Sequence, residues 1–175
     1  MTDAPDDKPK DVVASIAAQI AKIPVGDRAA LRRLYLTESY RAHGVVIKLL
    51  YRAGVAMPLS ADTIALWRLL AHVAALLSGT GGGHAHAPAQ RVGSALQAIG
   101  FSENRLLRLT AARGAALHGQ IVGAARMLAQ RGEASINLWT FFYLAGRDPV
   151  KAEEARIRIA QDYYAAAARS EGDSQ

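Results

Sequence analysis

The sequence predicts an all-α protein made of two small helical bundles, or lobes, joined by a glycine-rich linker. Of its 175 residues, 51% are hydrophobic but only 6% are aromatic. The apolar content is therefore mostly Ala, Leu, Val and Ile, a mixture rich in the best helix formers. Apolar residues recur at helical spacing, and no segment alternates apolar and polar residues as a half-buried strand would. The run SGTGGGHAHAPAQ, residues 78–90, has the composition of a linker.

These observations divide the chain into five parts. We predict a disordered N-terminal tail over 1–10, an N-terminal helical lobe over 11–78, a flexible Gly/His linker over 79–88, a C-terminal helical lobe over 89–168 and a disordered tail over 169–175.

In the N-terminal lobe, the first helix begins near Asp11, and Pro24 and Gly26 end it. Asp27 is expected to cap the next helix, RAALRRLYLTESYRAH, because a carboxylate can accept from the free N–H groups of a first turn. Gly44 is expected to interrupt this helix before VVIKLLYRAG.

Further along, Ser60 is a candidate N-cap for a helix over residues 62–77. The C-terminal lobe opens with a helix from about residue 89 to residue 98, and Gly100 stops it. A second helix starts at Ser102 and is expected to run to Arg131, where Gly132 is a good C-cap.

Two final helices contain SINLWTFFYLAG and PVKAEEARIRIAQDYYAAAAR, the latter with Pro149 near its first turn. Most of the aromatic residues in these elements and in the first lobe are interpreted as packing residues because of their helical spacing. They are Trp67, Trp139, Phe141, Phe142, Tyr143, Tyr163 and Tyr164.

The net charge of +6 comes from two segments. Residues 28–52 hold six cations and one acid, Glu38, and residues 102–131 hold five cations and one acid, Glu103. The rest of the chain is slightly acidic. Positive charge that is confined to particular segments indicates a polyanion as partner, although one such segment alone would more often be a solvated helix face.

Within these segments, several cations are one helical turn apart and so share a helix face: Lys48 with Arg52, and Arg105 with Arg108. Cations at one-turn intervals can follow successive phosphates without reading sequence. We predict phosphate contacts at Arg32, Arg33, Arg105, Arg108 and Arg113, and, as second choices, at Lys48, Arg52 and Arg91.

The start of the Ser102 helix carries an electrostatic conflict. Ser102 is placed as the N-cap, and Phe101 and Leu106 occupy the positions of a hydrophobic staple. Arg105 then stands at the third helical position, where a capping box has Glu or Gln and where the helix dipole disfavours a cation. We interpret Arg105 and the free N–H groups of the same turn as a joint anion site for a phosphate.

No catalytic motif is evident. TGGGHAH lacks the Lys-Ser/Thr and the preceding strand of a phosphate-binding loop. His84 and His86 have no further metal-ligating residue close by in sequence, so we expect no metal site. Isolated histidines and scattered carboxylates favour a non-enzymatic protein without cofactors. With no cysteine, no secretion-like start and no apolar run long enough for a membrane span, we expect a cytoplasmic protein with no membrane partner.

The run from RVGSALQAIG through FSENRLLRLTAAR to SINLWTFFYLAG, followed by ARIRIAQDYY, resembles the small subunit of the type I-E CRISPR Cascade complex, the CasB family. GDRAALRRL, residues 26–34, resembles the N-terminal basic motif of that family. The residues that carry the main resemblance are Gly93, Ala95, Leu96, Gly100, Ser102, Glu103, Arg105, Leu106, Arg108, Leu109 and Arg113, with Arg158, Tyr163 and Tyr164 later.

The resemblance implies an all-helical, non-catalytic subunit, present as two copies in a crRNA-guided surveillance complex. Its partners would be the crRNA, the target DNA, the displaced single-stranded DNA of the R-loop and other Cascade subunits. The predicted function is therefore sequence-independent binding of nucleic-acid backbone that stabilises the R-loop. The alternative is a basic helical scaffold that binds only protein.

Overall fold

The computed structural model describes residues 9–35, 40–79 and 83–172. This part of the chain contains helices and no strand, which confirms the all-α prediction. The helices are α1 (Pro9–Lys22), α2 (Val25–Arg32), α3 (Tyr40–Arg52), α4 (Ala61–Leu77), α5 (Val92–Ala98), α6 (Glu103–Ala111), α7 (Gly114–Gln130), α8 (Leu138–Ala145) and α9 (Pro149–Gly172).

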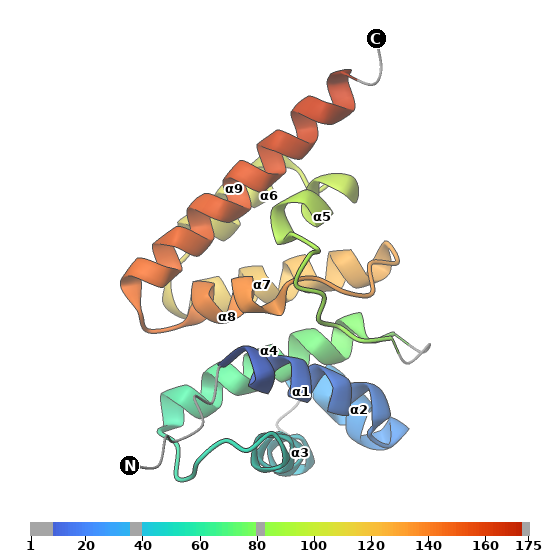
Figure 1. Cartoon of the computed structure of the whole chain (residues 1–175), viewed down its shortest axis with the longest axis vertical. Coiled ribbons are helices and arrows are strands. Elements are labelled where there is room, and N and C mark those ends of the chain that lie inside the picture. The colour runs from blue at the N-terminus through green and yellow to red at the C-terminus, as the bar shows by residue number, and fades with distance from the viewer. Residues whose placement is uncertain (1–8, 36–39, 80–82, 173–175) are drawn as a thin grey trace, which may run out of the picture.

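The helices stack along the long axis of the molecule (Figure 1). The long α9 crosses one end and packs against α5, α6 and α8; α7 and α8 lie in the middle; and α1, α2 and α3 lie at the other end. Between these groups, α4 packs against α1, α2 and α3 on one side and against α7 and α8 on the other. Most of its residues from Trp67 onward are buried. One continuous cluster of buried apolar residues therefore runs through both halves of the chain.

The contact between α5 and α9 depends on a glycine. A Cβ atom built on Gly93 would lie 2.1 Å from the carbonyl oxygen of Ile159 and 2.7 Å from the backbone nitrogen of Tyr163. Real Cβ atoms are not found so close to backbone atoms, so no other residue fits without moving α5 away from α9. Gly93 is where these two helix backbones meet.

Several helix ends follow local chemistry as predicted. The Ser60 hydroxyl accepts from the backbone N–H of Thr63 at 3.2 Å, which confirms it as the N-cap of α4. Gly100 and Gly132 adopt φ angles of +73° and +87°, each one residue beyond the C-cap of α5 or α7. These left-handed conformations favour glycine and end both helices. Pro149 begins α9, where Asp148 accepts from the backbone N–H groups of the first turn.

In the N-terminal half, two predicted boundaries are wrong. Pro24, not Asp27, precedes the first residue of α2, and the Asp27 carboxylate instead pairs with Arg41 of α3. α3 also runs straight through Gly44, because nothing in its surroundings requires a break there. α2 ends at Arg32 and α3 begins at Tyr40, and residues 36–39 lie outside the described residues.

The single helix predicted from Ser102 to Arg131 is also wrong, since α6 ends at Ala111 and α7 begins at Gly114. Between them Arg113 is extended, with φ −138° and ψ 160°, and Gly114 has a φ of +54°. A left-handed glycine followed by a new helix turns the chain sharply, so α6 and α7 are separate helices that pack against each other.

The described part of the predicted flexible linker, residues 83–88, is anchored, so the prediction is wrong there. The backbone of Ile136 donates to the carbonyl of Ala85 at 3.1 Å and accepts from the N–H of Ala87 at 2.9 Å. Nδ1 of His86 accepts from the N–H of Leu138 at 3.2 Å. Residues 80–82 lie outside the described residues.

The predicted tails also need correction where they are described. α1 begins at Pro9, inside the predicted N-terminal tail, and α9 extends to Gly172, inside the predicted C-terminal tail. Residues 1–8 and 173–175 lie outside the described residues. The described helices include none that combines the length and apolarity needed to cross a bilayer.

Candidate nucleic-acid interface

Lys48 and Arg52 lie on the outer face of α3. This helix buries Ala42, Val45, Val46, Leu49 and Leu50 against α1, α2 and α4, and that apolar stripe turns the intervening positions outward. Both cations are exposed, and neither has a hydrogen-bond or ion-pair partner within the described part of the chain. α3 itself contains no acidic residue.

Arg105 and Arg108 lie on the outer face of α6, since Leu106 and Leu109 are the buried positions of this helix. Nη1 of Arg105 contacts Sδ of Met127 on α7 at 2.9 Å. The guanidinium of Arg105 therefore extends toward α7 in this structure. The joint anion site with the first turn of α6 stays a prediction. Arg108 is exposed and has no such partner among the described residues.

The first turn of α6 is built differently from the prediction. Ser102 has the N-cap backbone conformation, but its side chain makes no capping hydrogen bond. Phe101 and Leu106 are both buried, as a hydrophobic staple requires. The Glu103 carboxylate accepts from the Tyr164 hydroxyl at 2.6 Å, and this hydrogen bond raises the pKa of Tyr164. Glu103, the acid closest to the α6 cations in sequence, is thus held by α9.

Arg32 is used inside the protein. Its Nε donates to the carbonyl of Ala75 at 2.8 Å and its Nη2 to the carbonyl of Gly79 at 2.6 Å. Both acceptors lie at the C-terminal end of α4, where carbonyls lack helical partners and the dipole favours a cation. Burial, followed by the nearby Arg28, lowers the pKa of Arg32. Arg32 therefore ties α2 to the end of α4.

Arg113 has a similar role between α6 and α7. Its Nη1 lies within 3.0 Å of the carbonyls of Thr110, Ala111 and Ala112, and its Nη2 lies 3.6 Å from Oε2 of Glu153. The guanidinium thus satisfies carbonyls left open at the end of α6. Sequence spacing could not distinguish this role from a phosphate contact.

Arg91 and Arg33 are the last two of the eight cations predicted to contact phosphates. Arg91 pairs with Asp162 at 2.9 Å, and only 10% of the Asp162 side chain is exposed. Nε of Arg33 donates to the carbonyl of Ala29 at 3.3 Å, and Arg33 has a further interaction. The structure thus separates four cations that bond to backbone carbonyls or a carboxylate from the pairs on α3 and α6, which do not. Contact with nucleic acid stays a prediction for all eight.

Two features outside the predicted set lie beside the α3 pair. Tyr40 and Tyr51, on α3 itself, are 92% and 75% exposed. Arg52 also borders a hollow of about 430 Å³ together with Lys22, at the end of α1. Sequence reasoning missed this aromatic pair. It could have been found from the 11-residue spacing, which places both tyrosines on one face of a helix that has no acidic residue.

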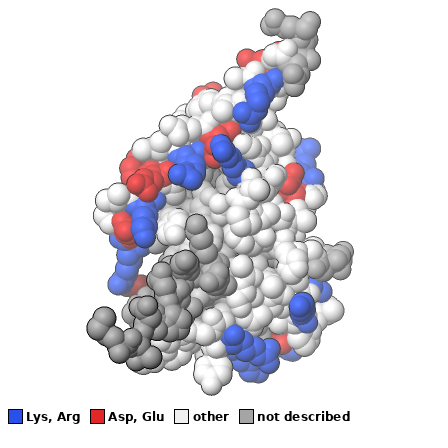
Figure 2. Space-filling model, in the orientation of Figure 1, with Lys and Arg blue, Asp and Glu red and all other residues white. Residues whose placement is uncertain are grey.

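The surface charge differs between regions. Figure 2 shows blue and red atoms interspersed along α9, whereas blue atoms predominate at the lower end of this view, where α3 lies. The exposed residues of α9 include both signs: Lys151 and Arg158 are basic, and Glu153 and Glu154 are acidic. Exposed carboxylates thus accompany the cations of α9, whereas α3 itself contributes none.

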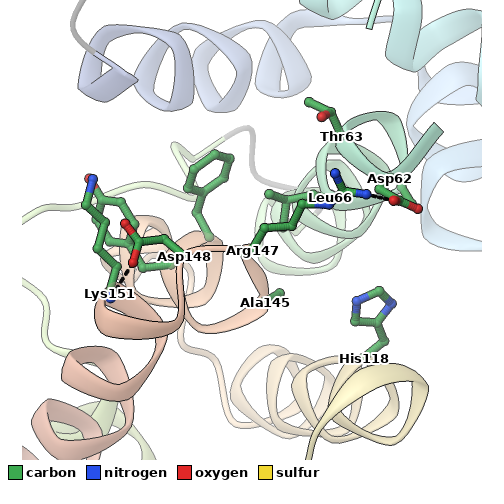
Figure 3. A pocket seen from close by; sticks show the side chains of 12 residues that line it. Asp62, Thr63, Leu66, His118, Ala145, Arg147, Asp148 and Lys151 are labelled. Atoms are coloured by element: carbon green, nitrogen blue, oxygen red, sulfur yellow. Dashed lines mark hydrogen bonds and ion pairs between the residues drawn. The ribbon is translucent and has the colours of Figure 1, made fainter. Parts of the chain in front are cut away.

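A hollow of about 450 Å³ lies between α4, α7 and the turn from α8 to α9 (Figure 3). Its wall is largely apolar and includes Leu66 and Ala145. Arg147 reaches across it to pair with Asp62. Nζ of Lys151 lies 5.3 Å from the ring centroid of Tyr143. Because its cations already have partners, this hollow is a poor anion site.

Two of the histidines, His72 and His86, serve the fold. Besides His86, which accepts from Leu138, His72 is fully buried, and its Nδ1 lies 2.7 Å from the carbonyl of Leu31. Burial lowers the pKa of both histidines. Within the described residues, no three His, Cys, Asp or Glu side chains are grouped so that they could hold a metal ion.

The fold and this surface define a small all-helical protein with exposed cation pairs on separate helices. The family model of the CRISPR-associated protein Cse2 matches residues 27–164, so the chain belongs to the Cse2 family. This confirms the resemblance to the small subunit of type I-E Cascade and makes the chain a Cascade subunit.

The comparison with solved structures supports the same fold. The crystal structure of CasB from Thermobifida fusca is similar, with a TM-score of 0.55 and 13% sequence identity. The match covers 87% of this chain and 97% of that one. No curated protein matches the chain.

Proposed function

We propose that this Cascade subunit binds nucleic-acid backbone without sequence specificity and thereby stabilises the R-loop and its displaced strand. Its partners are the crRNA, the target DNA, the displaced single-stranded DNA, the other Cascade subunits and a second copy of itself. It acts in the cytoplasm as a non-catalytic component.

The observation that carries this proposal is that two pairs of cations, Lys48 with Arg52 and Arg105 with Arg108, are not neutralised by a nearby carboxylate among the described residues. In each set the two side chains are exposed one turn apart, and within the described residues none of the four pairs with a carboxylate. The sets lie in different halves of the molecule (Figure 1), so a bound strand can be contacted at two separated points.

Because the free energy of R-loop formation is nearly balanced, such contacts can affect how stable the R-loop is. The RNA–DNA hybrid is about as stable as the DNA duplex that it replaces, so modest binding to backbone or displaced strand can decide how long the R-loop persists. Binding to phosphates releases counterions, and its strength therefore falls steeply with salt.

The test compares two double variants of the full chain, Arg105→Ala/Arg108→Ala and Lys48→Ala/Arg52→Ala, in binding to single-stranded DNA over a range of salt concentrations. If both cations of a pair contact phosphates, the slope of log K against log salt should flatten by about 1.4, at about 0.7 per contact. The affinity should fall by a similar factor for unrelated sequences.

The control variant Arg158→Ala/Arg169→Ala removes the same net charge from exposed positions of α9. It should retain most of the slope. If the control flattens the slope as much as the two test variants do, only net charge matters and the assignment is wrong. If the wild-type chain shows no salt-sensitive binding, the protein-only scaffold is correct.

A further inference from the structure

The outer face of α3 carries a stripe of exposed apolar and aromatic side chains. Tyr40 is 92% exposed, Ile47 40% and Tyr51 75%. With Gly44 they stand at helical positions i, i+4, i+7 and i+11, which lie along one face. At 1.5 Å per residue, the two tyrosines are about 16 Å apart along the helix axis.

Gly44 leaves this stripe open between the rings. A Cβ atom at Gly44 would meet nothing within 4 Å, so packing inside the protein does not require glycine there. Glycine inside a helix is nevertheless costly relative to alanine. The absence of a side chain exposes helix backbone between Tyr40 and Tyr51, where a flat group can approach closely.

A row of cations runs along one flank of the stripe. Arg41, Lys48 and Arg52 are spaced by seven and four residues, so they share a face next to the tyrosines. Arg41 pairs with Asp27 but keeps 63% of its side chain exposed. α3 itself contains no acidic residue, so Lys48 and Arg52 present positive charge on this flank, while Asp27 of α2 neutralises Arg41.

The hollow next to Arg52 extends this positive surface. It is lined by Ser15, Gln19, Lys22, Ile23, Pro24 and Arg52, and no carboxylate lines it among the described residues. The amide of Gln19 donates to the carbonyl of Leu49 and to the Ser15 hydroxyl, which fixes the wall between α1 and α3. The cations of two helices thus face one concave surface.

We propose that this face binds single-stranded nucleic acid, with unpaired bases stacked on Tyr40 and Tyr51 and the phosphates along Lys48, Arg52 and Lys22. Exposed aromatic rings beside a cationic groove are the combination by which proteins hold single strands without reading sequence. Bases in a duplex are already stacked and cannot cover the rings. The inference rests on the proposed function and narrows it: α3 contacts an unpaired strand through bases as well as phosphates.

The test uses two oligonucleotides of equal length, oligo(dT) and an abasic strand that has the same phosphates but no bases. The wild-type chain should bind oligo(dT) at least about tenfold more tightly than the abasic strand. Tyr40→Leu/Tyr51→Leu should remove this preference and leave the affinity for the abasic strand unchanged. Tyr40→Phe/Tyr51→Phe keeps both rings and should retain the preference, which distinguishes stacking from hydrogen bonding by the hydroxyls.

The outcomes separate this inference from the proposed function. Salt-sensitive binding of both oligonucleotides with equal affinity would leave backbone binding intact and overturn stacking. Binding of neither would overturn both. A Leu variant that loses affinity equally for both strands would also overturn the inference. So would a Leu variant that changes only the self-association of the chain, because the stripe would then be an interface between copies.

Discussion

Gly93 in α5 and Gly44 in α3 are both glycines inside helices, but their surroundings are opposite. At Gly93 an added Cβ would lie 2.1 Å from a backbone oxygen of α9, whereas at Gly44 it would meet nothing within 4 Å. The first glycine is required by contact between two helices of the chain. The second has no such neighbour among the described residues, which fits a surface that something else approaches.

The cations likewise divide into those that bond within the protein and those that do not. Near the helix junctions, Arg32 and Arg113 donate to backbone carbonyls at the ends of α4 and α6. On the outer face of α3, Lys48 and Arg52 have no partner among the described residues. Both groups belong to the two basic segments of the sequence, and what separates them is what the fold brings near each side chain.

The largest expected effect is that of Gly93→Ala. Because the clashing atoms are backbone atoms of α9, they cannot rotate away, and α5 must separate from α9. We expect a loss of about 3 kcal/mol or more in the free energy of unfolding, measured by urea denaturation. Gly123→Ala in α7, where a Cβ has open space, is the matched control and should not destabilise. Equal stability of both variants would show that the two sites do not differ.

Arg32→Ala should have the next largest effect. It removes two hydrogen bonds from a charged donor to the end of α4, so we expect a loss of about 1–3 kcal/mol in unfolding free energy. Lys48→Ala, at an exposed position, should change stability by less than about 0.5 kcal/mol. In DNA binding the order should be reversed, with Lys48→Ala weakening the affinity more than Arg32→Ala. A flatter salt slope for Arg32→Ala than for Lys48→Ala would show that Arg32 is the more important phosphate contact.

Acidification should give a smaller loss of stability through His72. Burial lowers its folded-state pKa, since its charged form would be desolvated beside Arg126, and Nε2 is buried without a partner among the described residues. The unfolded chain, with a pKa of about 6.5, binds the proton more readily. Stability is therefore full above that pKa and falls as the pH drops below it toward the folded-state value.

Unfolding measured between pH 7.5 and pH 5 should show this decline. His72→Asn cannot titrate and should reduce the slope, whereas substitution of the exposed His84 by Gln should not. The remaining slope should include His86, whose lowered pKa acts with the same sign. An unchanged slope in His72→Asn would contradict the role of His72.

Local chemistry predicted the helix ends that depend on neighbouring residues, such as Ser60, Gly100 and Gly132. It failed where distant elements decide. The α6–α7 break could not be seen because Gly114 is tolerated inside a helix, and only the fold gives it a φ of +54°. Likewise, no local pattern shows that Arg32 will meet carbonyls 43 and 47 residues away.

The smallest effect, and one of opposite sign, is expected from Gly44→Ala. The new methyl group meets no atom of the described residues within 4 Å, and alanine lowers the entropic cost of forming α3. The free energy of unfolding should rise by about 0.4–1 kcal/mol. If bases approach the open backbone between Tyr40 and Tyr51, the same variant should bind oligo(dT) more weakly while its affinity for the abasic strand is unchanged. A gain in stability without loss of oligo(dT) binding would mean that nothing approaches this glycine, and the contrast with Gly93 would then concern packing alone.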